Sequence, residues 1–302
     1  MRQLRTSRTR RITRPRRYLE RLARTACLAA LALAIGASPA AASLTIGQIS
    51  ADSEACEGPV DILQPTVTAG NAYVVPVVGT ITSWSHQAGP SVDQIAKMKV
   101  FRKVADPSTY QVVAHDGPRS LTANALNTFA TSLPVIPGDV LGMTPLTMSA
   151  GTSVACNFDA LGETQLFRFG GDLPDGVAGA FTPLSDLRLN ASAVVTPSNA
   201  FALGNIRRSK KRGTATLTVD VPNPGKLALS GKGVKTAGAG GALAAKTVPA
   251  AGEVKLKIRA KGKKKRKLNR TGKVKIKPRI TYTPTSGDPT TQSLRLQLKK
   301  RL

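Results

Sequence analysis

Hydrophobic and polar residues alternate in short runs near the C-terminus of the chain. The clearest runs occupy residues 213–222, 225–233, 254–261, 273–281 and 293–302. In VKLKIRAK, residues 254–261, every second residue is apolar and the others are Lys or Arg. A period of two places one face of a strand in a core and the other in water. Several such strands within about 100 residues predict an immunoglobulin-like β-sandwich.

Residues 43–198 carry shorter β-type runs, which are separated by Gly, Pro, Asn and Asp. These runs occupy residues 72–85, 98–104, 110–116, 133–143, 164–170 and 187–197. No run shows a long helical period, and regularly spaced strands between turn residues predict a jelly-roll-like antiparallel sandwich. The PGD sequence at 137–139 predicts a hairpin turn or the entry to a strand, since Pro fixes φ and Gly accepts positive φ. The predicted fold class is therefore all-β.

Charge divides the chain into three segments. Residues 1–42 have 10 Arg and one Glu, a net charge of +9. Residues 43–198 have 7 Lys and Arg against 13 Asp and Glu, and residues 199–302 have 27 against 3. The net charges of −6 and +24 predict an acidic domain, 43–198, followed by a basic domain, 199–302. An Arg-rich start, an apolar run at 27–37 and the small residues before Ser43 predict that 1–42 is a signal peptide.

Cleavage after Ala42 would leave a secreted or cell-surface protein. PRRYLE, residues 15–20, is similar to a twin-arginine signal, so both this route and the general secretory route stay open. An uncleaved anchor is the alternative to cleavage, although the apolar run is shorter than the roughly 20 residues that span a bilayer. The two cysteines that follow, Cys56 and Cys156, predict one disulfide in an exported chain, with unpaired thiols as the alternative.

Candidate catalytic chemistry is scarce. The two histidines, His86 and His115, lie in separate predicted strand ends, and no serine sits in a G-x-S-x-G motif. No His, Cys or carboxylate spacing is typical of zinc. The sequence therefore predicts a non-enzymatic binding or surface protein. A secreted hydrolase that uses His115 or His86 is the alternative from another class.

Two weaker features of the acidic domain suggest ligands. Trp84 is the only tryptophan, and an exposed indole bordered by Tyr73 and His86 would be a contact for glycan. The alternative is that the indole fills the core, where a lone tryptophan is more often found. Two acidic clusters could ligate calcium, but neither has EF-hand spacing, and solvated turns explain them better. They comprise Asp52, Glu54, Glu57 and Asp61, and Asp172 with Asp175. The predicted cofactor is none, with calcium as the alternative.

The basic domain carries the most distinctive pattern. The runs at 254–261 and 273–281 predict a hairpin, with KGKKKRKLNRTGK at 261–273 as the loop at its tip. Its outward cations would face one another, and like-charged cross-strand pairs cost roughly 0.2 to 1 kcal/mol each. A polyanion would turn that repulsion into binding free energy. The predicted polyanion contacts are Lys255, Lys257, Arg259, Lys263, Lys264, Lys265, Arg266, Lys267, Lys273, Lys275 and Lys277.

An exported chain meets anionic wall polymers, acidic polysaccharide and membrane head groups, and these are the predicted partners. Nucleic acid fits less well, because Phe201 and Tyr282 are the only aromatic residues of the basic domain that could stack on bases. The alternative is an edge that lysine protects from aggregation, in a structural spacer without a ligand. Pro278 fits this alternative, since it interrupts the row of donors and predicts an edge strand or bulge.

The basic domain resembles a Lys-rich β-sandwich module found at the C-terminal end of exported proteins from high-GC Gram-positive bacteria. The resemblance rests on residues 210–235, 254–277 and 280–302. The acidic domain is similar to the partner often joined to that module, through GTITSWSHQAGP at 79–90, LPVIPGDVLGM at 133–143 and FALGNI at 201–206. The resemblance implies export and a two-domain architecture, and it assigns no catalytic residue.

Overall fold

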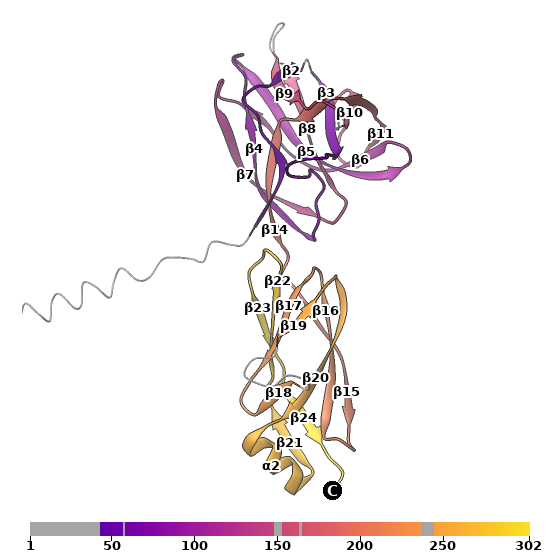
Figure 1. Cartoon of the computed structure of the whole chain (residues 1–302), viewed down its shortest axis with the longest axis vertical. Coiled ribbons are helices and arrows are strands. Elements are labelled where there is room, and N and C mark those ends of the chain that lie inside the picture. Colours follow the sequence, from indigo (N-terminus) through magenta and orange to yellow (C-terminus); the bar gives the residue numbers. More distant parts are fainter. Residues whose placement is uncertain (1–42, 57, 148–152, 163–164, 237–244) are drawn as a thin grey trace, which may run out of the picture. The chain divides into compact units, whose positions relative to one another are not determined.

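The computed structural model describes residues 43–302 except 57, 148–152, 163–164 and 237–244 (Figure 1). The predicted signal peptide therefore lies outside the described residues. The described chain consists of antiparallel β-sheets and one short helix, so the predicted all-β sandwich class is confirmed. Each sheet draws its strands from one side of residues 198–201 only. The buried hydrophobic clusters divide at the same place.

The described residues of the acidic domain form three sheets. Their strand orders are β1-β14-β4-β7, β11-β6-β5-β8-β3-β10-β12 and β13-β9-β2. The strands are β1 Leu44–Gln48, β2 Glu54–Cys56, β3 Val60–Thr66, β4 Gly79–Gln87, β5 Gln94–Ala105, β6 Thr109–Ser120, β7 Leu126–Val135, β8 Val140–Thr147, β9 Val154–Asp159, β10 Gln165–Gly170, β11 Ala178–Ala180, β12 Thr182–Ser185, β13 Leu187–Leu189 and β14 Ala191–Pro197.

Strand β5 lies between two hydrophobic clusters, and this explains why apolar and polar residues alternate only imperfectly in MKVFRKV, residues 98–104. Met98 and Val100 belong to one cluster, while Phe101 belongs to another. A strand that is buried on both faces loses its polar face, so its sequence no longer alternates cleanly. The PGD sequence at 137–139 is a strand entry, because β7 and β8 pair with different neighbours.

The basic domain also contains three sheets, with strand orders β15-β16-β20-β18, β19-β17-β22-β23 and β21-β24. The strands are β15 Ala202–Ser209, β16 Thr214–Val221, β17 Gly225–Ser230, β18 Val234–Thr236, β19 Ala245–Val248, β20 Gly252–Ala260, β21 Lys273–Ile276, β22 Arg279–Pro284, β23 Thr290–Ser293 and β24 Leu296–Lys299. Alternate apolar residues of these sheets meet in one buried cluster, which includes Leu217, Leu256, Ile280 and Tyr282.

The predicted hairpin of 254–261 with 273–281 is wrong. Strand β20 pairs with β16 and β18, whereas β21 pairs with β24. The predicted loop at its tip is instead the helix α2, Gly262–Thr271. Lys, Arg and Leu are good helix formers, so a run of cations between two strands has a favourable helical propensity. Gly272 ends the helix in the left-handed region, and its N–H donates to the carbonyl of Leu268 at 3.0 Å.

The predicted edge strand or bulge at Pro278 is not found, since β22 lies between β17 and β23 in its sheet. Pro278 instead divides the predicted strand at 273–281 in two. It lies between β21 and β22, where the chain passes from one sheet to another. The carbonyl of Pro278 accepts a hydrogen bond from the N–H of Leu294 at 3.2 Å, and Leu294 lies at the matching break between β23 and β24. The chain therefore passes from one sheet to the other at the same position in both segments, between β21 and β22 and between β23 and β24.

Candidate polyanion-binding surface

The predicted polyanion contacts lie on three different elements. Lys255, Lys257 and Arg259 project from β20, while Lys273 and Lys275 project from β21 and Lys277 follows directly. The remaining contacts, Lys263 to Lys267, lie on α2. Because β20 and β21 belong to different sheets around one core, their outward cations do not form a single ladder. The structure divides the predicted surface into two faces, with α2 between them in sequence.

The cations of β20 do not face other cations across β16. Lys255 lies opposite Thr218, and Lys257 lies opposite Thr216. The repulsion that the predicted hairpin would have stored is therefore absent at these two positions. It persists where Arg259 of β20 lies opposite Lys235 of β18, and between β21 and β24, where Lys273 lies opposite Lys299.

Helix α2 presents cations without any acidic counterpart. Its first turn contains no acidic residue and its N-terminus has no side-chain cap, although the N-terminal end of a helix dipole disfavours cations. Leu268 is its one buried residue, and it belongs to the core cluster of the basic domain. Tertiary packing of Leu268 therefore holds in place a helix that its own charges disfavour.

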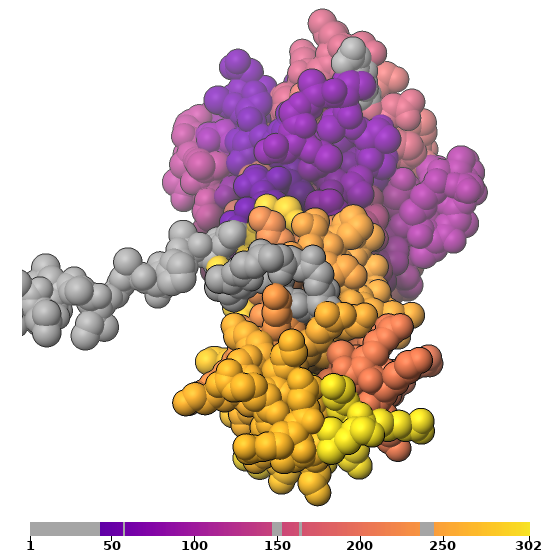
Figure 2. Space-filling view, turned by 60° about the horizontal axis from the view of Figure 1, so that its bottom comes forward, coloured from indigo at the N-terminus to yellow at the C-terminus, as the bar shows by residue number. Residues whose placement is uncertain are grey.

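A hollow of about 530 Å³ opens beside α2, β21 and β24. It is lined by Lys232, Lys264, Lys275, Ile276, Lys277, Arg295, Leu296 and Gln297. A second hollow shares Lys232 and Lys277 with it and adds Gly231, Arg279 and Ser293. We call the two together the cationic groove. Figure 2 views the end of the basic domain where the orange atoms around α2 and the yellow C-terminal atoms gather.

Lys232, Arg279 and Arg295 are groove residues that the sequence did not single out. Lys232 lies in a Gly-Lys-Gly turn between β17 and β18, with φ of +127° at Gly231 and +79° at Gly233. A Cβ at Gly231 would lie 2.6 Å from the carbonyl oxygen of Lys277, so only glycine fits there. This close approach places Lys232 against the groove. In the sequence, the two glycines that flank Lys232 were the only sign of such a tight turn.

The groove cations are not compensated by nearby carboxylates. Asp220 and Glu253 lie opposite each other across β16 and β20, about 20 Å along β20 from Arg259. Arg259 is at the end of β20 that pairs with β18, next to the turn that carries Lys232. Asp288 lies in the turn between β22 and β23, at the opposite end of that hairpin from Arg279. Among the described residues, every ion pair lies in the acidic domain. The end of the basic domain with the groove is therefore uniformly cationic.

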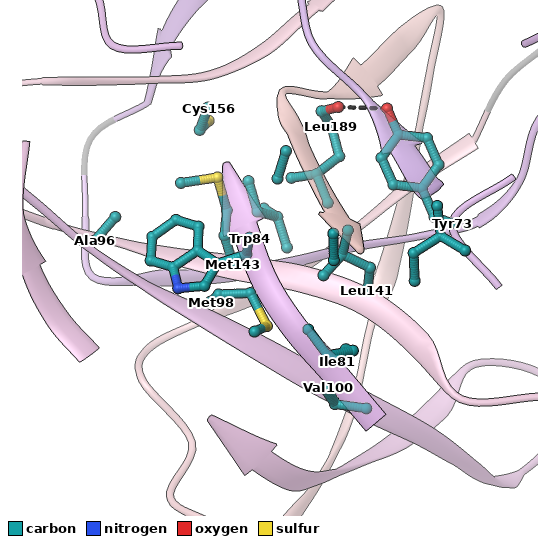
Figure 3. Packing of buried hydrophobic residues seen from close by; sticks show 14 of the residues in the cluster. Tyr73, Ile81, Trp84, Ala96, Met98, Val100, Leu141, Met143, Cys156 and Leu189 are labelled. Carbon is teal, nitrogen blue, oxygen red and sulfur yellow. Dashed lines mark hydrogen bonds between the residues drawn. The ribbon is translucent and has the colours of Figure 1, made fainter. Parts of the chain in front are cut away.

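The prediction of a glycan contact at Trp84 is wrong. Trp84, Tyr73 and His86 are all buried, with exposed fractions of 1% or less. Figure 3 shows Trp84 packed among core side chains that include Met98 and Met143, and Tyr73 Oη donates to the carbonyl of Leu189 at 2.5 Å. The indole Nε1 donates to Asp116 at 2.7 Å. In a chain with 4% aromatic residues, the largest side chain fills the core.

The acidic clusters are partly occupied by the protein's own cations. Lys99 is buried and donates to Asp61, to Asp172 and to the carbonyl of Leu173, each at 2.7 Å. Burial raises the pKa of Asp61, while the hydrogen bond from Lys99 acts in the opposite direction. Lys97 donates to Asp172 at 2.6 Å. Among the described residues, which exclude Glu57, no group of three His, Cys, Asp or Glu is placed to hold a metal ion.

The two histidines occupy different environments. His86 Nδ1 donates to the carbonyl of Asn190 at 2.7 Å, inside the core. His115 Nδ1 lies 2.8 Å from Asp175 at the surface. A catalytic pair also needs a nucleophile, and in the described part of the chain no Ser, Thr or Cys is hydrogen-bonded to either ring. The hydroxyl of Ser85, which neighbours His86 in the sequence, lies 2.9 Å from the hydroxyl of Thr128.

Cys56 and Cys156 lie at disulfide distance, with their Cα atoms 5.7 Å apart, as the sequence predicted. The pair joins β2 to β9 and closes a loop across a sequence separation of 100 residues. No helix in the described ranges is long and apolar enough to cross a membrane. The chain matches no family model, and no curated protein shows sequence similarity to it. The resemblance to exported Lys-rich modules therefore stays a prediction.

Proposed function

We propose that this chain is an exported, non-enzymatic surface protein whose basic domain retains it on an anionic cell envelope. The observation that carries the proposal is the uncompensated charge of residues 199–302, which have 27 Lys and Arg against 3 Asp and Glu. A small domain needs a net charge of only about 2 to 8 to stay soluble. The excess is therefore better explained by attraction to a polyanion than by solubility.

Export is the second part of the proposal. It is supported by the Arg-rich and apolar segments of residues 1–42 and by the cysteine pair, since disulfides persist in oxidising compartments. In such a compartment the available polyanions are wall polymers, acidic polysaccharide and lipid head groups. Each cation near an anionic surface contributes about 1 kcal/mol, and salt screens this contribution.

The secreted-hydrolase alternative has less support. His86 is buried, and His115 lies beside Asp175 without a hydrogen-bonded nucleophile. Removing both imidazoles would abolish the activity of such a hydrolase, whereas an electrostatic surface protein would be unaffected.

Co-sedimentation of residues 43–302 with bacterial cell envelopes tests the proposal. We expect the protein to pellet at low salt and to be released steeply as salt rises, because exposed cations are screened over a Debye length of about 10 Å at 0.1 M. Envelopes from which the anionic polymers have been extracted are the control, and they should retain little protein. A protein that stays in the supernatant at every salt concentration would support a spacer without a ligand instead.

A further inference from the structure

We propose that the cationic groove is the binding centre of the basic domain and that its ligand is an extended chain of phosphate groups. The inference rests on the proposed function and deepens it, because it assigns the attraction to one site and one chemistry. The cations that would contact the ligand are Lys232, Lys264, Lys275, Lys277, Arg279 and Arg295.

The groove has the dimensions of a ligand site. Its larger hollow, about 530 Å³, falls within the roughly 300–1,000 Å³ of small-molecule pockets. The second hollow, of about 440 Å³, continues from it through Lys232 and Lys277. The side chain of Lys264 is fixed across this region, since its Nζ donates to the carbonyl of Lys275 at 3.1 Å.

The spacing of the cations favours a chain of charges over a single ion. Lys275, Lys277 and Arg279 are all exposed and occur at every second residue. Lys275 lies on β21, Arg279 begins β22, and Lys277 lies between them, where the chain passes from one sheet to another. The charges therefore follow the chain from one sheet to the next, with up to about 7 Å of extended chain between neighbours. Lys232 and Arg295 extend the groove on other segments. An extended polymer with regularly repeated anions matches this arrangement.

The chemistry of the lining favours phosphate. Lysine and arginine side chains donate hydrogen bonds and accept none, and both bind phosphate readily. No carboxylate lines the groove, and no aromatic side chain lines it either. The hydroxyls of neutral polysaccharides both donate and accept, and only Gln297 and Ser293 among the described lining side chains can accept from them. Bases or sugars would gain from aromatic stacking. Phosphate oxygens only accept, so they complement a lining that mainly donates.

Two variants with equal loss of charge test the site on residues 43–302. The groove variant is Lys232→Gln, Lys277→Gln and Arg295→Gln. The control variant is Lys255→Gln, Lys257→Gln and Arg259→Gln on β20. This strand belongs to a different sheet from β21, β22 and β24, which carry groove residues. We expect the affinity for linear inorganic polyphosphate at fixed low salt to fall on the order of 100-fold in the groove variant. This follows from about 1 kcal/mol per cation and 1.4 kcal/mol per factor of ten. The control should lose no more than about 10-fold.

The outcomes separate the groove from the general attraction. Equal losses in both variants would overturn the groove and leave the proposed function intact, since the charge would then act diffusely. Failure of the unchanged protein to bind polyphosphate at low salt would overturn both. Equally tight binding of polygalacturonate, a carboxylate polymer, per unit charge would overturn the assignment to phosphate.

Vesicles of phosphatidylglycerol distinguish the two sources of phosphate. If the vesicles bind as tightly as polyphosphate and the groove variant loses that binding, the phosphate is a lipid head group. If the vesicles bind more weakly than polyphosphate, the ligand is a polymer. The first result would overturn the extended chain of phosphates while keeping the groove as a phosphate site, whereas the second supports the proposal in full.

Discussion

His86 illustrates how burial decides the chemistry of a single residue. Its side chain has no exposed surface, and burial lowers its pKa to about 4. Nδ1 donates a hydrogen bond to the carbonyl of Asn190, and Nε2 has no hydrogen-bond partner in the described chain. In the folded protein the imidazole of His86 is therefore neutral, and it cannot act as a base toward solvent.

The pKa of His86 predicts acid sensitivity. The unfolded chain takes up a proton on this ring near pH 6.5, while the folded chain does so only near pH 4. The contribution of His86 to the free energy of unfolding should therefore be fully present above pH 6.5. It should fall by about 3 kcal/mol as the pH drops to 4. Denaturant unfolding at several pH values measures this slope. Substitution of His86 by Asn should flatten it and substitution of the exposed His115 should not; identical slopes would contradict the account.

Residue environments were only partly predictable from the sequence. The disulfide partners could be predicted because an exported chain with two remaining cysteines has one pairing. The burial of Trp84 could not, since a lone tryptophan suits both a surface platform and a core. The burial of Lys99 was also hidden, because a lysine in a strand normally marks the wet face. Only the approach of Asp61 and Asp172 from other segments makes its burial tolerable.

At the scale of elements, alternation predicted which faces of the strands are buried, but it could not predict their partners. Residues 254–261 alternate as expected, and Leu256 and Ile258 lie in the core. A period of two shows which face of a strand is buried, but it does not show which strand lies beside it. The pairing of 254–261 with 273–281 was therefore predicted from closeness in sequence alone, and it was wrong. The groove depends on the pairing of β21 with β24, and it could not be predicted without that pairing.

Helix α2 provides a prediction at the same scale. Lys263→Glu places an acid in the first turn, within reach of Arg266 and Lys267, and should stabilise α2 by about 0.5–1.5 kcal/mol. Arg270→Glu makes the same change of charge beside the same two cations, but at the C-terminal end of the dipole. Hydrogen exchange of the α2 amides should therefore slow in the first variant and not in the second. Equal protection in both would show that the dipole has no influence here.

At the scale of the whole molecule, charge is segregated along the sequence. The described carboxylates of the acidic domain include several that pair with its own Lys and Arg, whereas the basic domain has no ion pair among its described residues. The sequence indicated this segregation of charge directly, because the charges of each domain can be counted without a structure. The structure adds that the three acids of the basic domain lie away from the groove.

The affinity of residues 43–302 for linear polyphosphate, measured over a series of salt concentrations, tests the central claim most directly. Release of counterions makes the logarithm of affinity fall linearly with the logarithm of salt, by roughly 0.7 per contact for a flexible single chain of phosphates. Six groove cations therefore predict a slope of about −4 or steeper. A slope near zero, or no binding at the lowest salt, would contradict an electrostatic function for the basic domain.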